Sequence, residues 1–380
     1  MEFGLFHSAH VPRRADPDEQ RRAEHQRLLD EIAIGEAADR SGFKYLWFTE
    51  HHFLDEYSHI SASEVFMSFV AARTERVHLG SGIWNLTPPV NPPARVAERV
   101  AMLDHLSGGR FEFGTGRGSS STEYTGFEIP DGPTTRSMHD EALAEILRMM
   151  KETVYPGFDG KHFSMPARTV LPKPWTVPHP PLWLACGNPE SFEKAGRLGM
   201  GALCFTIGPP DVLAPLIEVY KNAVAHAEPI GEYVNNNVAC VTRLLCFDNG
   251  DEARRRMTEV GSGRYQSLVF RYLDSFPRPE GLPAWPELVP EPDLASIEGQ
   301  VAAGVLTGGD PDDCANAVQR YVDIGCDQLI FGQLNNLLTG DEGLRSVETF
   351  GHHVIGRFDL EAEHSTTRQR RRQWEESGQI

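Results

Sequence analysis

Short runs of β-branched and aromatic residues alternate with longer segments of helical period along almost the whole 380-residue chain. This alternation predicts parallel strands joined by crossover helices. The runs that we interpret as strands cover residues 3–7, 45–48, 77–84, 110–114, 182–186, 202–205, 238–246 and 328–331. Eight β/α units in this length favour a (β/α)8 TIM barrel over a doubly wound sheet. Active sites of such barrels lie at the carboxyl ends of the strands.

The segments between the runs have apolar residues three and four positions apart, as in Leu143, Ile146, Leu147 and Met150. One apolar face of each predicted helix can therefore cover the outside of the barrel. A helix start is marked by Asn188, where a capping residue precedes a proline and an acidic residue.

We interpret residues 1–356 as a single barrel domain with long loop insertions at its C-terminal face. Residues 119–136, 156–181 and 277–292 exceed ordinary loop length. The proline-rich segment 277–292 is our candidate lid, and a surface excursion is the alternative. The tail, residues 357–380, mixes charges of both signs, and we expect it to be frayed or to contact another subunit.

Composition narrows the function to small-molecule chemistry. A formal net charge of -18 argues against a nucleic-acid partner, which needs basic patches. The six cysteines form no C-x-x-C pair, which is typical of a reduced cytosolic protein. Because the sequence has neither a secretory leader nor a membrane-spanning stretch, we expect a cytoplasmic protein with no membrane partner.

The stretch TEHHF, residues 49–53, follows the second predicted strand and places Glu50, His51 and His52 at the barrel mouth. Neighbouring strand residues point to opposite faces, so the two histidines cannot both face one metal ion unless the strand has already ended, and we expect no metal. An imidazole pKa of about 6.5 suits proton transfer at neutral pH. We therefore favour His51 as an acid or base, with simple packing at the rim of the core as the alternative.

A glycine-rich stretch, GGRFEFGTGRG at residues 108–118, follows the third helix and contains the fourth strand. Bare backbone amides can approach an anion closely, and Arg117 can bind a phosphate through two hydrogen bonds. The stretch matches neither a Walker loop nor a dinucleotide fingerprint. A tight turn with an exposed arginine explains the same residues.

The predicted helix start at residues 188–191 offers a second anion site. Free backbone amides and the helix dipole attract negative charge there, and Ser191 and Lys194 can add donors. Ordinary helix capping explains these residues too, so they indicate an anion site only in combination with the glycine-rich stretch.

Taken in order, WFTEHHF, AARTERVHLGSGI, NPPARVAERVAMLDHLSGGRFEFGTGRG and ACGNPESFEKAGRLG resemble the bacterial luciferase-like flavin monooxygenases. The resemblance extends from Met1 to about Phe331. It implies a (β/α)8 barrel that holds reduced FMN, supplied by a separate NAD(P)H-dependent flavin reductase. It also implies that O2 forms a C4a-peroxyflavin, which oxygenates a small, mostly apolar substrate.

The resemblance also assigns residues. It implies His51 as the catalytic histidine, with Glu50 or a backbone group setting its tautomer. Cofactor contacts are implied for Asn85, Gly116, Arg117, Arg136, Gly187, Glu190, Ser191 and Lys194. Residues 83–86 fall where the family often has a non-proline cis peptide.

Three positions depart from the pattern of the luciferase alpha chain. Gly116 stands where that chain has a cysteine, and Glu141 where it has a second phosphate-binding arginine, for which Arg136 can substitute. Lys194 replaces a small hydroxyl residue and would strengthen phosphate attraction. These departures favour oxygenation over light emission.

Three rival functions stay open: an F420-dependent hydride-transfer oxidoreductase, a metal-dependent barrel hydrolase and a flavin-binding protein without catalysis. The substrate is not identified, because Trp84, Tyr124, Phe127 and Phe205 suit a pocket wall or a core equally well. We expect a homodimer, because uncovered barrel faces in the resembling family often pair subunits.

Overall fold

The computed structural model describes residues 1–206, 208–274, 278–332, 337–338 and 340–378. Parallel strands close into an eight-stranded barrel, as the sequence predicted. They pair around the barrel in the order β1 (Glu2–His7), β2 (Tyr45–Phe48), β3 (His78–Ser81), β5 (Phe111–Gly116), β8 (Leu182–Ala185), β9 (Gly201–Phe205), β10 (Val238–Cys246) and β12 (Gln328–Gly332). Strand β12 pairs back onto β1, so the barrel has no open edge.

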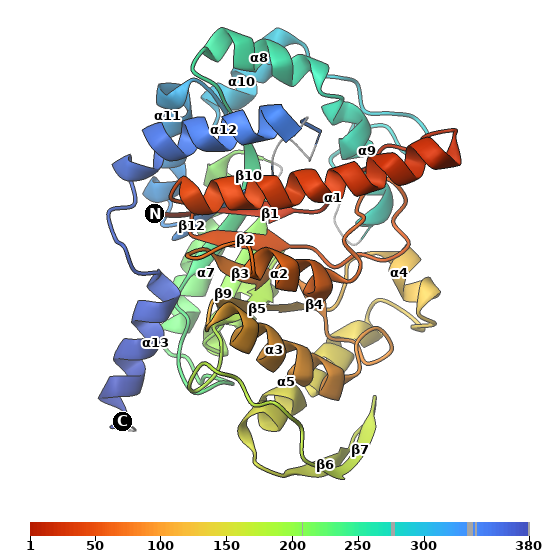
Figure 1. Cartoon of the computed structure of the whole chain (residues 1–380), viewed down its shortest axis with the longest axis vertical. Helices are drawn as coiled ribbons and strands as arrows, with labels where there is room; N and C mark the ends of the chain where they lie inside the picture. The colour runs from red at the N-terminus through yellow and green to blue at the C-terminus, as the bar shows by residue number, and fades with distance from the viewer. Residues whose placement is uncertain (207, 275–277, 333–336, 339, 379–380) are drawn as a thin grey trace.

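Helices cover the outside of the barrel (Figure 1). The crossover helices are α1 (Pro17–Arg40), α2 (Ser63–Ala71), α3 (Pro93–Ser107), α5 (Thr134–Lys151), α6 (Pro189–Arg197), α7 (Ala214–Val224), α11 (Pro311–Asp323) and α12 (Gly340–His353). Beyond β10, α8 (Gly250–Glu259) and α10 (Leu294–Ala302) pack against each other and against the short strand β11 (Thr307–Gly309). The described residues also include the 3-10 turns η1 (Pro210–Val212) and η3 (Ile355–Arg357). None of the helices in the described ranges is long and apolar enough to cross a membrane.

Two indole rings fill the middle of the barrel. Trp47 on β2 and Trp183 on β8 are fully buried and meet edge to face, with ring centroids 5.3 Å apart. Glycines on the neighbouring strands leave the space, because a Cβ at Gly80 would lie 2.3 Å from the Trp47 ring. This packed layer closes the barrel below the carboxyl ends of the strands.

The third predicted strand, residues 77–84, is interrupted, so the prediction of one continuous strand is wrong. Strand β3 ends at Ser81, and a separate strand β4 (Trp84–Asn85) pairs with β5. The Gly82–Ile83 peptide bond between them is cis and lies directly before the expected run 83–86. The apolar pattern continues through the break, so the pattern did not reveal it.

The stretch 156–181 contains an antiparallel hairpin rather than an irregular loop. Strands β6 (Tyr155–Asp159) and β7 (Ser164–Arg168) pair beside α5 (Figure 1). The carboxylate of Glu141 on α5 accepts hydrogen bonds from the backbone amides of Lys161 and His162, at 2.9 and 2.8 Å. Glu141 thus braces the hairpin turn.

The tail also has a defined structure. Residues 365–376 form helix α13 (Ser365–Glu376), which lies at the end of the barrel where β1 begins (Figure 1). Its first turn donates hydrogen bonds to buried carboxylates, from Ser365 N to Glu2 at 2.8 Å and from Thr366 Oγ1 to Glu112 at 2.6 Å. The expected fraying is therefore not seen between residues 365 and 376.

Candidate active site

A cavity of about 610 Å³ opens at the carboxyl ends of the barrel strands. Phe6, Ile83 and Val241 pack against the indole layer and line the cavity. Together with Gly116, Ala185 and Gly332 they form its floor. This size is typical of sites for cofactors and small ligands. All ten residues that the sequence assigned to the site line this one cavity.

His51 faces the cavity and contacts a carboxylate from another loop. Its Nδ1 atom lies 3.2 Å from Oε1 of Glu123 on helix α4 (Ser121–Gly126). The same oxygen accepts a hydrogen bond of 2.8 Å from the backbone nitrogen of His52. We expected Glu50 or a backbone group to orient the ring, but the structure places Glu123 there. No local signal marked Glu123, because the contact joins loops that follow two different strands.

Glu50 instead holds the backbone beside the cavity. Its buried carboxylate accepts hydrogen bonds from the Asn85 backbone nitrogen at 2.9 Å and from Nδ2 of Asn91 at 2.9 and 3.0 Å. His52 Nε2 lies 3.5 Å from this carboxylate, so the two neighbouring imidazoles face different acids. Among the described residues, no group of three or more His, Cys, Asp or Glu is arranged to hold a metal ion.

The part of the cavity wall formed after β5 and at α6 carries cationic side chains. Arg117, at the end of β5, donates to Thr135 Oγ1 at 3.0 Å, and Arg136 Nη1 lies 3.2 Å from Glu190. Lys194 on α6 pairs with the Asp140 carboxylate, whose pKa falls to about 2 because the contacts with His139 and Lys194 outweigh its burial.

The start of α6 closes this charged wall. The Ser191 hydroxyl oxygen accepts hydrogen bonds from the backbone nitrogens of Gly187 and Asn188, at 3.0 and 3.1 Å, in a capping box. This confirms the predicted helix start. Capping already uses the Ser191 backbone amide, which donates to Asn188 Oδ1 at 3.0 Å and so has its hydrogen bond within the helix start.

Helix α9 (Ser262–Tyr272) covers the cavity, and the sequence did not single it out. Tyr265, Gln266, Val269 and Phe270 of α9 line the cavity. The described part of the predicted lid, residues 278–292, lies behind α9 instead. There the backbone nitrogen of Val289 donates to Ser267 Oγ at 2.8 Å, and none of these residues lines the cavity. Pro277 lies outside the described residues.

Of the four aromatic residues that we considered for a pocket wall, one lines the cavity and three pack elsewhere. Phe205 lines the cavity. Trp84 is fully buried against Phe111 and Phe113 outside the strands, and Tyr124 and Phe127 pack in a small cluster behind the cavity.

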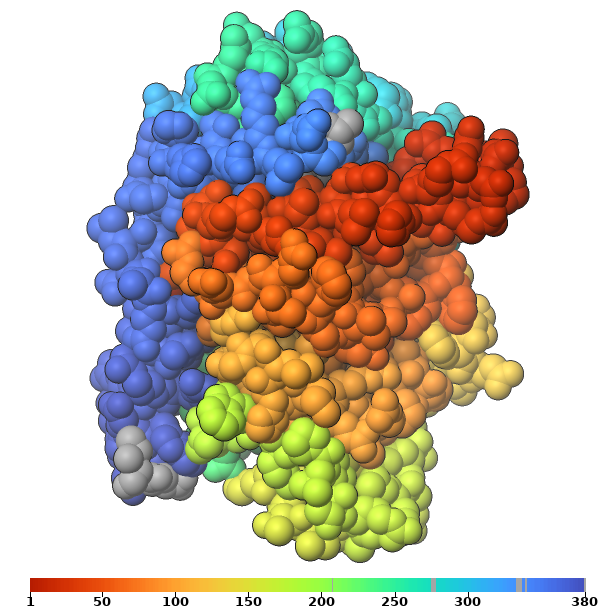
Figure 2. Space-filling view, viewed as in Figure 1, coloured from red at the N-terminus to blue at the C-terminus, as the bar shows by residue number. Residues whose placement is uncertain are grey.

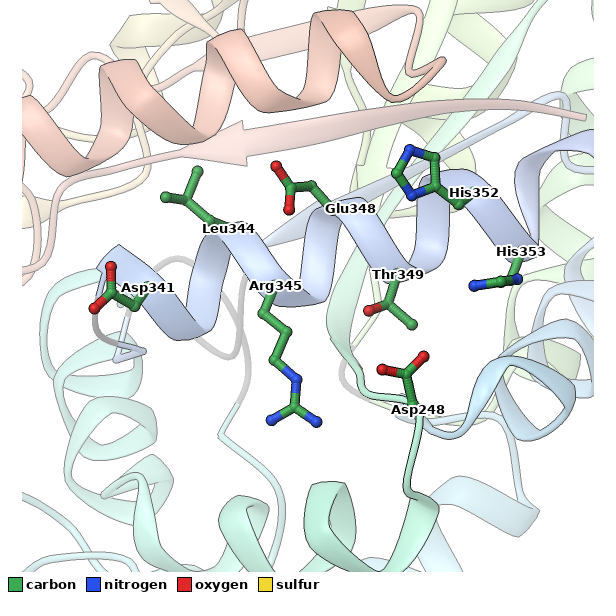
Figure 3. A pocket seen from close by; sticks show the side chains of 8 residues that line it. All are labelled: Asp248, Asp341, Leu344, Arg345, Glu348, Thr349, His352 and His353. Carbon is green, nitrogen blue, oxygen red and sulfur yellow. The ribbon is translucent and has the colours of Figure 1, made fainter.

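A second, more open pocket lies along α12 (Figure 3). Arg345 and Thr349 project from the helix on the side of Asp248, and Glu348 projects from the other side. Arg345 is already paired with Glu252 at 2.6 Å and stacks over Phe247. The guanidinium of Arg345 has an internal partner, and this second pocket shares no lining residue with the cavity at the barrel mouth. We therefore do not assign the second pocket to the active site.

The fold and the cavity together define a TIM-barrel protein with an imidazole and a cationic wall around an apolar floor. A sequence model described as luciferase-like monooxygenase matches residues 1–328, and the chain belongs to this family.

Relatives with described activities include both oxygenases and F420-dependent enzymes. The 4-hydroxyprotoasukamycin monooxygenase of Streptomyces nodosus subsp. asukaensis is 29% identical, covering 94% of this chain and 92% of that protein. The oxygenase component of the flavin-dependent trigonelline monooxygenase of Acinetobacter baylyi is 31% identical over 52% of each chain. The F420-dependent glucose-6-phosphate dehydrogenase of Mycobacterium avium is 28% identical, covering 80% of this chain and 87% of that protein.

The fold has close structural counterparts. The crystal structure of the monooxygenase RslO1 from Streptomyces bottropensis superposes with a TM-score of 0.75 at 24% identity, covering 94% of this chain and all of that chain. At this identity the likeness supports the fold alone.

Proposed function

We propose that this protein is the oxygenase of a two-component flavin-dependent monooxygenase, which uses reduced FMN and O2 to oxygenate a small organic substrate. The observation that carries the proposal is that one cavity combines a cationic wall, formed by Arg117, Arg136 and Lys194, with the imidazole of His51 and an apolar floor. Two relatives are named as monooxygenases, which supports the proposal. A separate flavin reductase is proposed on the same basis, because the trigonelline enzyme is named as an oxygenase component.

The residues of the cavity fit FMN. Arg117, Arg136 and Lys194 would hold the phosphate, because their charges exceed those of their acidic partners Asp140 and Glu190. Gly116 has no side chain, and a Cβ at this position would collide with Ile83. The floor beside Gly116 would therefore leave room for the aromatic ring system of the flavin. When bound, reduced FMN supplies the electrons that activate O2.

The side chains of the protein would then position the reacting groups and transfer a proton. His51 is proposed to accept or donate the proton at its Nε2 atom, while Glu123 holds the ring through Nδ1. Helix α9 and its apolar residues would exclude bulk water from the site. Glu50 acts as a positioning residue through its hydrogen bonds to Asn85 and Asn91.

A second candidate function is F420-dependent hydride transfer. An F420-dependent relative covers 80% of the chain, and the cationic wall would suit any phosphorylated flavin analogue. The cofactor itself therefore distinguishes the two proposals.

The test is to measure equilibrium binding of FMN and of F420 to the purified protein, followed by turnover with the preferred reduced cofactor in ¹⁸O2. We expect preferential binding of FMN, and ¹⁸O in the product when a panel of ketones, terpenoids and organosulfur compounds is supplied. Preferential binding of F420, with substrate turnover in the absence of O2, would replace the first candidate with the second.

We also propose that the protein forms a homodimer through α2 and α3. These helices expose Val65, Phe69, Met102 and Leu106, and the ring of exposed Trp175 lies 5.7 Å from that of His105 on α3. Figure 2 shows this part of the chain on one face, in orange and lime green. Contiguous exposed apolar surface marks interaction sites. Light scattering should give twice the chain mass, and Phe69→Glu should give the single-chain mass.

A further inference from the structure

Arg243 is a cavity residue to which neither the sequence nor the proposed reaction has assigned a role. It lies on β10 two residues after Val241, so both side chains point toward the barrel interior, and both line the cavity. Its partner on β12 is Gly332, which has no side chain, and β9 ends beside Val241. Strand β12 therefore contributes no side chain beside Arg243 at this level of the barrel.

Arg243 differs from the other cavity arginines in having no internal partner. Arg117 and Arg136 donate to Thr135 and Glu190. Among the residues that the structure describes, Arg243 forms no hydrogen bond or ion pair, and the ionisable group that acts on it is the Tyr321 phenol. Burial lowers the pKa of Arg243 to about 10, so it still carries its charge at neutral pH.

Arg243 is half-buried at the cavity, and a cation that loses part of its water there without a counter-charge is costly, so proteins normally pair it. This chain has 54 acidic side chains against 36 basic ones, yet none of the described acids pairs with Arg243. The cost is removed when a ligand supplies the anion. A residue of this kind in a ligand cavity therefore indicates an anionic group on the ligand.

The anion that meets Arg243 is distinct from the cofactor phosphate. The phosphate wall is built at the ends of β5 and β8, and β9 separates these strands from β10. On the β9–β10 side of the cavity the lining combines the apolar side chains of Phe205 and Val241 with the threonines Thr206 and Thr242. A single planar guanidinium in such surroundings matches a planar carboxylate, which it can bind through two parallel hydrogen bonds.

We propose that Arg243 is a specificity-determining residue that binds a carboxylate on an otherwise apolar substrate. This inference rests on the proposed function, since it names the substrate class of the same cavity. It refines the expectation of a mostly apolar substrate by one negative group, held at the β10 side of the mouth while His51 lies at the β2 side.

The test compares a carboxylate with its neutral analogue. Octanoate and octanamide are titrated by calorimetry into the wild type, Arg243→Gln and Arg243→Lys, each with and without FMN. Arg255→Gln is the matched control, because it removes the same charge from an exposed position on α8.

We expect the wild type and Arg255→Gln to bind octanoate roughly tenfold more tightly than octanamide. Arg243→Gln should lose this preference, Arg243→Lys should retain part of it, and the dissociation constant of FMN should be unchanged. No carboxylate preference in the wild type, or an equal preference in Arg243→Gln, would overturn the inference. Weaker binding of reduced FMN to Arg243→Gln, without any carboxylate preference in the wild type, would assign the charge to the flavin instead.

A failure of the proposed function can be distinguished from a failure of the inference about Arg243. If FMN does not bind to the wild type, the proposed function is lost, and the titration without FMN still measures the carboxylate preference of Arg243.

Discussion

The carboxylate of Glu123 lies 3.2 Å from Nδ1 of His51, although the two residues are 72 positions apart in the chain. Glu123 comes from the loop after β5, and His51 from the loop after β2. The contact fixes which nitrogen of the imidazole faces away from the carboxylate, so the free Nε2 is the atom proposed to serve the substrate.

We expect His51→Ala to lower the rate of substrate oxygenation roughly 100-fold, the scale of a lost acid or base, without changing FMN affinity. Glu123→Ala should lower it roughly tenfold, because the ring loses its orientation. Rates are measured with the best substrate of the panel, and Thr125→Ala, on the exposed side of the same helix, is the control. A full rate in His51→Ala would remove this histidine from the reaction.

Arg117→Ala should raise the dissociation constant of FMN by roughly ten- to a hundredfold, because a charge-assisted contact to the phosphate is lost. Fluorescence titration measures the constant directly. Arg168→Ala, an exposed arginine on the β6–β7 hairpin, should bind FMN as the wild type does. Equal affinities in the two variants would place the phosphate elsewhere.

Gly116→Ala tests the floor of the cavity. A Cβ there would lie 2.5 Å from Cδ1 of Ile83, so the added methyl group must displace that side chain. Overpacking of this kind costs about 1–3 kcal/mol, and we expect a lower Tm and weaker FMN binding. Ile83→Ala added to Gly116→Ala should restore both. If the effects of the two substitutions on Tm and on FMN binding are additive, the two residues do not interact.

We expect the free energy of unfolding to depend on pH, because Glu112 is buried inside the barrel. Burial raises the pKa of Glu112 to about 7, and the neutral carboxyl group can donate to Nδ1 of His78, 2.7 Å away. Burial lowers the pKa of that imidazole to about 3, so it stays neutral and accepts. A carboxyl group with a raised pKa stabilises the fold fully below its unfolded-state pKa, and this contribution is lost as pH rises through about 7.

Glu112→Gln cannot ionise and keeps a donor toward His78. We expect it to match the wild type in urea unfolding near pH 4, and to exceed it near pH 8 by up to roughly 3 kcal/mol. A difference between the two proteins that does not vary with pH would show that Glu112 does not titrate in the folded state.

Local patterns predicted the barrel and the position of the site, because strand ends and glycine-rich turns are read from neighbouring residues. All ten assigned residues face one cavity, although their individual roles remain proposals. The roles of Glu123, α9 and α13 were not predictable in this way. Each depends on contacts between distant segments, as when Thr366 reaches Glu112 across 254 positions.

The most direct test of the account is an anaerobic titration of the protein with reduced FMN, followed by mixing with O2 in a stopped-flow spectrometer. We expect saturable binding of one flavin per chain. The bound reduced FMN should be reoxidised, with O2 uptake, at a rate that differs from that of free reduced FMN. No binding, or reoxidation indistinguishable from that of free flavin, would contradict it.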